Sequence, residues 1–252
     1  MNRNYVLKRL CCYLFAIVFV LAGWHISALI INKPALPTPL ETIPVFIKYA
    51  TALWPDFQIS FFRLLVSLLL GTVLALPIGL FLGRSKRFNA LFGPVLYLLY
   101  PLPKIVLLPI LLALFGLGGA PKIALVTLTI FFQVVMVMRD AAKAVPEQML
   151  TSVESLGGSR WQLWRHVIIP ATLPELFTTL RVSSAVAIAV LFFAEVFAGS
   201  TGLGYFIMNS WSMVNYPRMF AGIIALAILG VIVYEAFDVV ERRLTRYKRA
   251  SL

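Results

Sequence analysis

Six long apolar runs dominate the pattern of hydrophobic and polar positions along this chain. A helix that crosses a bilayer needs about 20 mostly apolar residues, and each run is close to that length. The first run is also longer than the apolar part of a typical signal peptide, so we interpret it as a retained span. The pattern predicts an all-α, polytopic membrane protein with six transmembrane helices, at residues 10–31, 61–83, 89–112, 120–138, 176–198 and 219–240.

The third run is irregular, because Pro101, Pro103 and Pro109 interrupt it and Lys104 lies among them. Each proline removes a backbone donor and disfavours the helical conformation of the residue before it. Non-helical backbone at membrane depth is tolerated only where protein or a water-filled cavity covers it. The segment is therefore expected to face the interior, with a simple kink packed against neighbouring helices as the alternative.

Lysine and arginine are distributed unevenly between the two sets of loops. Most of them lie in the N-terminus, the loops after the second and fourth spans, and the tail, which places these segments and both termini in the cytoplasm. The predicted organisation is an N-terminal span with a proline-rich external strap (1–57), a transmembrane domain (58–240) with a cytoplasmic loop at 139–175, and a basic cytoplasmic tail (241–252). The strap, which extends to Ser60, is expected to hold one short helix at Glu41–Leu53.

Composition supports this picture and narrows the function. The 252 residues are 61% hydrophobic and 13% charged, with a mean hydropathy of +0.92, which no soluble domain of this size can bury. The net charge of +12 follows the topology rule for cytoplasmic loops, so a nucleic-acid partner is not expected. The two cysteines, Cys11 and Cys12, are adjacent and form no disulfide framework. No HExxH motif or Cys/His cluster occurs, so we expect no metal site.

One polar segment, Thr151–Pro174, contains the signals of a helical hairpin. Gly157 and Gly158 favour a left-handed stop for a first helix. Ser159 and Gln162 form an S-x-x-Q capping box for a second helix, which Pro170 and Pro174 are expected to end. The second helix would carry apolar side chains on one side, so the residues alone leave two interpretations open. The hairpin either docks a cytosolic protein or lies on the membrane surface.

The same segment resembles the EAA loop of permease subunits of ATP-binding-cassette (ABC) importers. That motif has E-A-A, three residues, a glycine, nine residues and I-x-L-P. With the glycine on Gly157, the hydrophobic pair falls on Val167 and Ile169 and the proline on Pro170, whereas Thr151-Ser152-Val153 replaces E-A-A. The segments KPALPTPLETI, LPKIVLLPILLALFGLGGAPKI and AEVFAGSTGLGYFIMNS resemble the branch that imports sulfonates, taurine, nitrate and thiamine precursors.

The resemblance implies a type I ABC importer permease fold in the bacterial inner membrane, and a transport subunit rather than an enzyme. It implies a permease homodimer, two cytoplasmic ATPase subunits that hold ATP and Mg²⁺, an external solute-binding protein and surrounding lipid. No phosphate-binding G-x-x-x-x-G-K-[ST] motif occurs in this chain, so ATP hydrolysis is expected on a separate chain. The residues expected to couple to the ATPase are Glu154, Leu156, Gly157, Gly158, Ser159, Arg160, Trp161, Val167, Ile169 and Pro170.

Ionisable or helix-breaking residues at membrane depth are candidates for the transport pathway or its gate. These are Pro101, Pro103, Lys104, Arg181 and Glu195. Structural ion pairing, or extension of a long side chain toward the interface, is the alternative for the charged members. A secondary transporter or channel without an ATPase is the alternative function. It predicts inverted repeats and several mid-membrane charges, whereas the two halves of this sequence show no convincing repeat and its mid-membrane charges are few.

Overall fold

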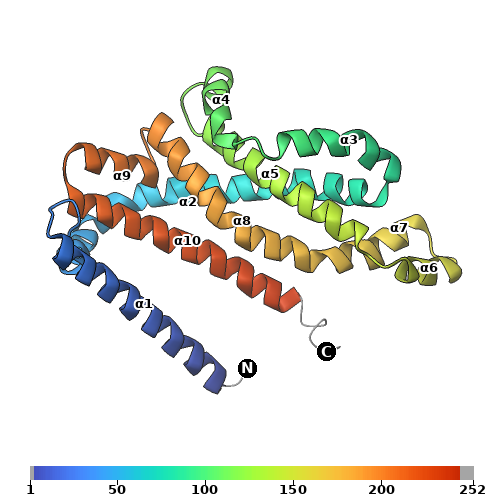
Figure 1. Ribbon diagram of the computed structural model, residues 1–252, viewed down its shortest axis with the longest axis horizontal. Coiled ribbons are helices and arrows are strands. Elements are labelled where there is room, and N and C mark those ends of the chain that lie inside the picture. The colour runs from blue at the N-terminus through green and yellow to red at the C-terminus, as the bar shows by residue number, and fades with distance from the viewer. Residues whose placement is uncertain (1–2, 245–252) are drawn as a thin grey trace.

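The computed structural model describes residues 3–244, and all regular elements in that range are helices (Figure 1). Five are long and apolar enough to cross a membrane, and the number is six if the bent pair Lys86–Leu99 and Lys104–Phe115 counts as one span. The all-helical fold class expected from the sequence is confirmed, and the six expected spans agree with the upper of these two numbers. Part of the predicted basic tail, 245–252, lies outside the described residues.

In chain order the elements are α1 (Arg3–Ile31), α2 (Pro39–Arg84), α3 (Lys86–Leu99), η1 (Lys104–Leu107), α4 (Leu108–Phe115), α5 (Ala120–Lys143), α6 (Glu147–Ser155), α7 (Arg160–Leu163), η2 (Trp164–Ile168), α8 (Ile169–Ala198), α9 (Leu203–Ser212) and α10 (Tyr216–Leu244).

Helices α2, α5, α8 and α10 pack against one another and form the body of the molecule (Figure 1). The buried centre is made by side chains such as Leu64 of α2, Ile130 of α5, Leu191 of α8 and Leu229 of α10. Helix α1 diverges from this body, and the α6–α7 hairpin and α9 lie at opposite ends of it (Figure 1). A ring stack between Trp24 and Phe220 joins the end of α1 to the start of α10.

Glycines allow α2 to approach α5 closely. A Cβ at Gly79 would lie 2.8 Å from Met138 Cβ, and a Cβ at Gly83 would lie 2.3 Å from the Arg139 carbonyl oxygen. Small residues at a helix interface allow this kind of backbone contact inside a membrane. The G-x-x-x-G pair of the second span therefore packs within the chain.

The prediction of a long strap before the second span was wrong. The irregular strap covers only residues 32–38, and a single 46-residue helix, α2, then begins at a capping box formed by Thr38 and Glu41. The expected short helix is the first part of α2. Pro44 and Pro55 each remove one backbone donor, which costs the helix one hydrogen bond. Buried neighbours such as Leu53 keep the segment packed, so neither proline ends α2.

Two further elements differ from expectation. The third span is a pair of helices, Lys86–Leu99 and Lys104–Phe115, that meet at 85°. The second helix of the hairpin does not stop at Pro170 or Pro174, because a π-helical turn, η2, joins α7 to α8 in a 39-residue run. In this wide turn the Ile169 N–H donates to the carbonyl of Trp164, five positions earlier. The hydrogen-bond pattern of the helix has therefore already changed before Pro170, and the donor that this proline lacks does not end the helix.

Candidate functional site

The hairpin predicted from the sequence is present, and its turn is defined by hydrogen bonds. The Gly158 N–H donates to the Val153 carbonyl and the Gly157 N–H donates to the Glu154 carbonyl, both at 2.9 Å. This is the Schellman pattern, which needs a left-handed residue. Gly157 supplies it with φ of +75°. A Cβ at Gly158 would lie 2.4 Å from Val153 Cγ1, so both glycines are required for this turn.

The capping box that starts the second helix is also confirmed. The Gln162 N–H donates to Ser159 Oγ at 3.3 Å, and the Ser159 N–H donates to Gln162 Oε1 at 2.6 Å. These bonds satisfy backbone donors that the first turn of a helix leaves free. The hairpin is therefore a rigid unit whose shape is set by residues close together in sequence.

The two faces of the hairpin differ in burial. Leu163, Val167 and Ile168 are buried against the body of the molecule, and Trp164 stacks on Phe81 of α2 with ring centroids 6.4 Å apart. The opposite face leaves large apolar side chains exposed. Of the ten predicted coupling residues, six are exposed, namely Glu154, Leu156, Gly157, Ser159, Arg160 and Trp161. Gly158, Ile169 and Pro170 are half-buried, and Val167 is buried.

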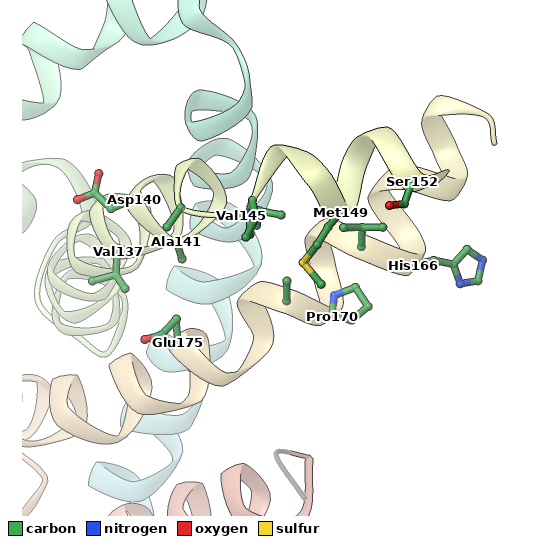
Figure 2. A pocket seen from close by; sticks show the side chains of 13 residues that line it. Val137, Asp140, Ala141, Val145, Met149, Ser152, His166, Pro170 and Glu175 are labelled. Carbon is green, nitrogen blue, oxygen red and sulfur yellow. The ribbon is translucent and has the colours of Figure 1, made fainter. Parts of the chain in front are cut away.

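A cavity of about 1030 Å³ lies behind the hairpin, between the end of α5, α6 and the start of α8 (Figure 2). Most of its lining is apolar, and the carboxyl groups of Asp140 and Glu175 are the acidic groups in it. Asp140 accepts hydrogen bonds from the Arg139 guanidinium at 2.8 and 2.9 Å. Among the described residues, no group of three or more His, Cys, Asp or Glu side chains is arranged to hold a metal ion.

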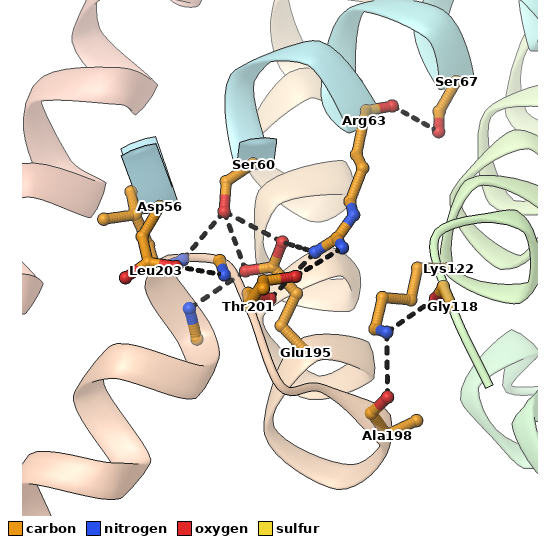
Figure 3. Close-up of polar contacts among 12 residues, drawn as sticks. Asp56, Ser60, Arg63, Ser67, Gly118, Lys122, Glu195, Ala198, Thr201 and Leu203 are labelled. Carbon is orange, nitrogen blue, oxygen red and sulfur yellow. Dashed lines mark hydrogen bonds and ion pairs between the residues drawn. The ribbon is translucent and has the colours of Figure 1, made fainter. Parts of the chain in front are cut away.

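A polar cluster lies at the other end of the molecule, around the fully buried side chain of Glu195 (Figure 3). Its carboxylate pairs with the Arg63 guanidinium at 2.8 Å. It also accepts hydrogen bonds from Ser60 Oγ at 2.8 Å and from the Gly204 N–H at 2.9 Å. A buried charge is stable only when it is paired and hydrogen-bonded, and both conditions hold here.

The same cluster fixes the segment between α8 and α9. Arg63 donates to the Thr201 carbonyl at 3.0 Å, and Asp56 accepts from the Gly202 N–H at 2.7 Å. Gly202 has φ of +106°, and a Cβ there would lie 2.3 Å from the Glu195 carboxylate. The buried Lys122 ammonium donates to the carbonyls of Ala198, at the end of α8, and Gly118. Residues of α2, α5 and α8 thus hold this end together.

Glu195 is the member of this cluster that was predicted from the sequence, and its partners were missed. Arg63 and Lys122 each lie within a predicted apolar span, which was a signal that each side chain needs a buried partner. The sequence did not show which partner, because Arg63 and Glu195 are 132 positions apart.

Lys104 lies at the break in the third span. Its ammonium donates to the carbonyls of Leu99, Tyr100 and Leu102 at 2.8, 3.1 and 2.8 Å, and it lies 4.5 Å from the centroid of the Phe132 ring. An ammonium has three N–H donors, so these contacts use all of them. Pro101 and Pro103 belong to the same break. Lys104 therefore satisfies carbonyls that the end of α3 leaves without helical partners.

Arg181 forms ion pairs with α10. Its guanidinium lies 2.9 Å from Asp238 Oδ1 and 3.5 Å from Glu241 Oε2, and it stacks over the Tyr234 ring at 5.6 Å. The structure does not bring Lys104, Arg181 and Glu195 together into one site. Each is held by a separate structural contact, and their role in a pathway or gate stays a prediction.

Comparison with known families decides the class of this protein. Residues 75–246 match the model of the binding-protein-dependent transport system inner membrane component. The chain belongs to this family. It is thus a permease subunit of a binding-protein-dependent transport system, located in the inner membrane, and the alternative of a self-contained transporter or channel is set aside.

Curated relatives of the chain are transport permeases. The taurine transport system permease protein TauC of Escherichia coli is 29% identical over 90% of this chain and 86% of its own length. The putative aliphatic sulfonates transport permease protein SsuC of Bacillus subtilis is 29% identical over 92% and 85%. The formylaminopyrimidine transport permease protein ThiX of Halalkalibacterium halodurans is 27% identical over 90% and 91%.

A solved structure shares the fold. A chain of the MetNI methionine ABC transporter, in an inward-facing conformation, superposes with a TM-score of 0.66 at 20% sequence identity. The match covers 77% of this chain and 96% of that one. The architecture of this permease is therefore that of an ABC importer permease.

Proposed function

We propose that this permease is driven by a cytoplasmic ATPase that docks on the α6–α7 hairpin, and that it works as a homodimer. The observation that carries the proposal is the exposed face of the hairpin, where Leu156 is 88% and Trp161 68% exposed while the opposite face is packed. Exposed apolar side chains on a rigid element are typical of protein docking sites. The ATP and Mg²⁺ would be held by the ATPase and not by this chain.

The continuous run from α7 through η2 to α8 supports a mechanical route across the membrane. A force applied at Arg160 acts on one end of a 39-residue helical run, and Glu195 lies near its other end. Closure of the ATPases would shift the hairpin, and the run would carry this displacement to the outer polar cluster. Such coupling requires that the permease has two conformational states. Ligands that act at the two ends of the run must each favour a different one of these states.

The proposed substrate is a small solute delivered by an external binding protein. The names of the relatives, which transport taurine, aliphatic sulfonates or formylaminopyrimidine, support a sulfonate or a thiamine precursor, and the resemblance noted in the sequence adds nitrate. Measuring which of these compounds binds the cognate external protein, and which then enters proteoliposomes containing the complex, would test this assignment. A complex that imports none of them would refute it.

A matched pair of glycine variants tests the docking role. Gly157 and Gly116 both have φ near +74°, at +75° and +73°, and neither Cβ position has a neighbour within 4 Å. Valine at either place strains the backbone, because a β-branched residue rarely adopts positive φ. The strain is greater at Gly116, whose ψ of −171° lies in a region that only glycine adopts readily, so a loss caused by strain alone should be at least as large there. We expect Gly157→Val to lower binding-protein-stimulated ATPase activity and uptake at least about tenfold with normal membrane insertion, and Gly116→Val to leave stimulation largely intact.

The readout is ATPase activity and uptake of the reconstituted complex, with and without the loaded binding protein. Wild-type stimulation and uptake in Gly157→Val would show that the hairpin is not the coupling element. Equal losses in both variants would show that general strain, and not docking, causes the defect.

A further inference from the structure

An apolar groove lies between the last turns of α2 and the length of α3, separate from the hairpin and from the polar cluster. Its volume is about 540 Å³, and every side chain that lines it is apolar. Such a groove offers no hydrogen bond to a polar solute, so its occupant must present hydrocarbon. The lining residues are Pro77, Ile78, Phe81, Leu82, Phe88, Phe92, Val95 and Leu96.

One end of the groove meets a basic turn. Leu82 and Phe88 flank this turn, which contains Arg84, Lys86 and Arg87. Lys86 and Arg87 are exposed, and none of the three forms an ion pair with an acidic side chain among residues 3–244; the one contact of Arg84 is a 3.5 Å hydrogen bond to the Ala142 carbonyl. The turn is therefore a positive rim with free charge next to a hydrocarbon slot.

Two basic residues in the first turn of α3 also oppose the helix dipole. The N-terminal end of a helix carries partial positive charge, and α3 has no acidic residue in its first turn to balance it. A negative group bound at the rim would offset this repulsion. The rim and the groove thus favour a ligand that is anionic at one end and apolar along the rest.

We propose that this groove binds one anionic phospholipid, with an acyl chain between α2 and α3 and the phosphate on the basic turn. Clusters of Lys and Arg beside membrane helices recognise anionic headgroups in this way. A second copy of the chain is a poorer occupant. In a two-fold interface centred here, each copy would present the same basic residues to the other, and like charges would repel.

The bound lipid would touch the element that the hairpin rests on. Phe81 lines the groove, packs edge-to-face on Phe88 at 5.0 Å between centroids, and stacks on Trp164 of η2. An acyl chain in the groove therefore supports the aromatic contact at the base of the hairpin. This inference does not depend on the ATPase docking proposed above.

Native mass spectrometry of the full-length detergent-solubilised permease tests the proposal. Phosphatidylglycerol and phosphatidylcholine are titrated separately, and retained lipid is counted per chain. We expect wild type to retain one phosphatidylglycerol in preference to phosphatidylcholine. Lys86→Gln with Arg87→Gln should weaken that retention about tenfold or more, because both charges near the headgroup are lost. Val95→Trp, which fills the groove, should abolish it.

The matched control is Lys143→Gln with Arg243→Gln, which removes two other exposed basic side chains. It should retain the lipid as wild type does. Equal weakening in the control and in the turn variant would show only general attraction of basic protein for anionic lipid, and would overturn the site. Efficient disulfide cross-linking between two copies through Val95→Cys, in a chain lacking Cys11 and Cys12, would instead assign the groove to a dimer interface and also overturn it.

Discussion

At the level of single residues, Glu195 and Arg63 form the contact that holds together the end of the helical body opposite the hairpin. Each satisfies the other in a buried, low-dielectric site, and each also holds the α8–α9 segment, through Gly204 and Thr201 respectively. Removing one partner of such a pair leaves an uncompensated buried charge, which costs far more than the pair contributes.

This contact predicts a non-additive stability effect. Glu195→Ala should lower the free energy of unfolding by about 3–5 kcal/mol, because Arg63 loses its carboxylate. Glu195→Gln combined with Arg63→Gln should recover part of that loss, since no unpaired charge remains. The thermal unfolding midpoint of the detergent-solubilised protein measures both. Glu175→Gln, at an exposed carboxylate, is the control, and an Ala variant as stable as this control would contradict the prediction.

At the level of elements, the hairpin was predictable and the long helices were predictable only in part. Gly157 and the Ser159–Gln162 box act over a few positions, so their geometry follows from local sequence. The continuity of α2 does not. Pro44 and Pro55 favour a break locally, and packing of the segment against distant helices outweighs that preference. The helix α9, which depends on Gly202 and its contacts, was also missed.

The prediction for the broken span concerns the contribution of Lys104 to stability. Lys104→Met removes three donors and leaves the carbonyls of Leu99, Tyr100 and Leu102 without them. The Leu99 carbonyl keeps a 3.3 Å hydrogen bond from the Leu102 N–H, and the three residues are partly exposed. A hydrogen bond to a charged group contributes about 1.5–3 kcal/mol, so the free energy of unfolding should fall by about that amount. Lys48→Met is the matched control, because that exposed ammonium only lies 5.9 Å from the Tyr49 ring centroid.

Thermal unfolding in detergent compares the two methionine variants. A drop in midpoint confined to Lys104→Met is the expected outcome. Equal midpoints would mean that the three carbonyl contacts contribute nothing to the break. Normal stability together with lost uptake would instead favour the pathway role that the sequence suggested for this lysine.

At the level of the whole molecule, the hairpin and α9 lie at opposite ends of the helical body, which makes the predicted topology testable (Figure 1). In a chain with Cys11 and Cys12 replaced by serine, Met213→Cys should react with a membrane-impermeant maleimide added to spheroplasts. Lys143→Cys should react only after permeabilisation. Both side chains are exposed, so burial does not explain a difference. The reverse pattern would place the termini outside the cell.

Local sequence was sufficient for the composition of the spans, for the glycine turn and capping box of the hairpin, and for the family resemblance, because these depend on residues within a few helical turns. The pairing of Arg63 with Glu195, the sharing of Lys122 between Gly118 and Ala198, and the groove beside the basic turn depended on tertiary packing. A charged residue within an apolar run indicates, from the sequence alone, that its side chain needs a buried partner. The identity of that partner is settled only when helices far apart in the chain pack side by side.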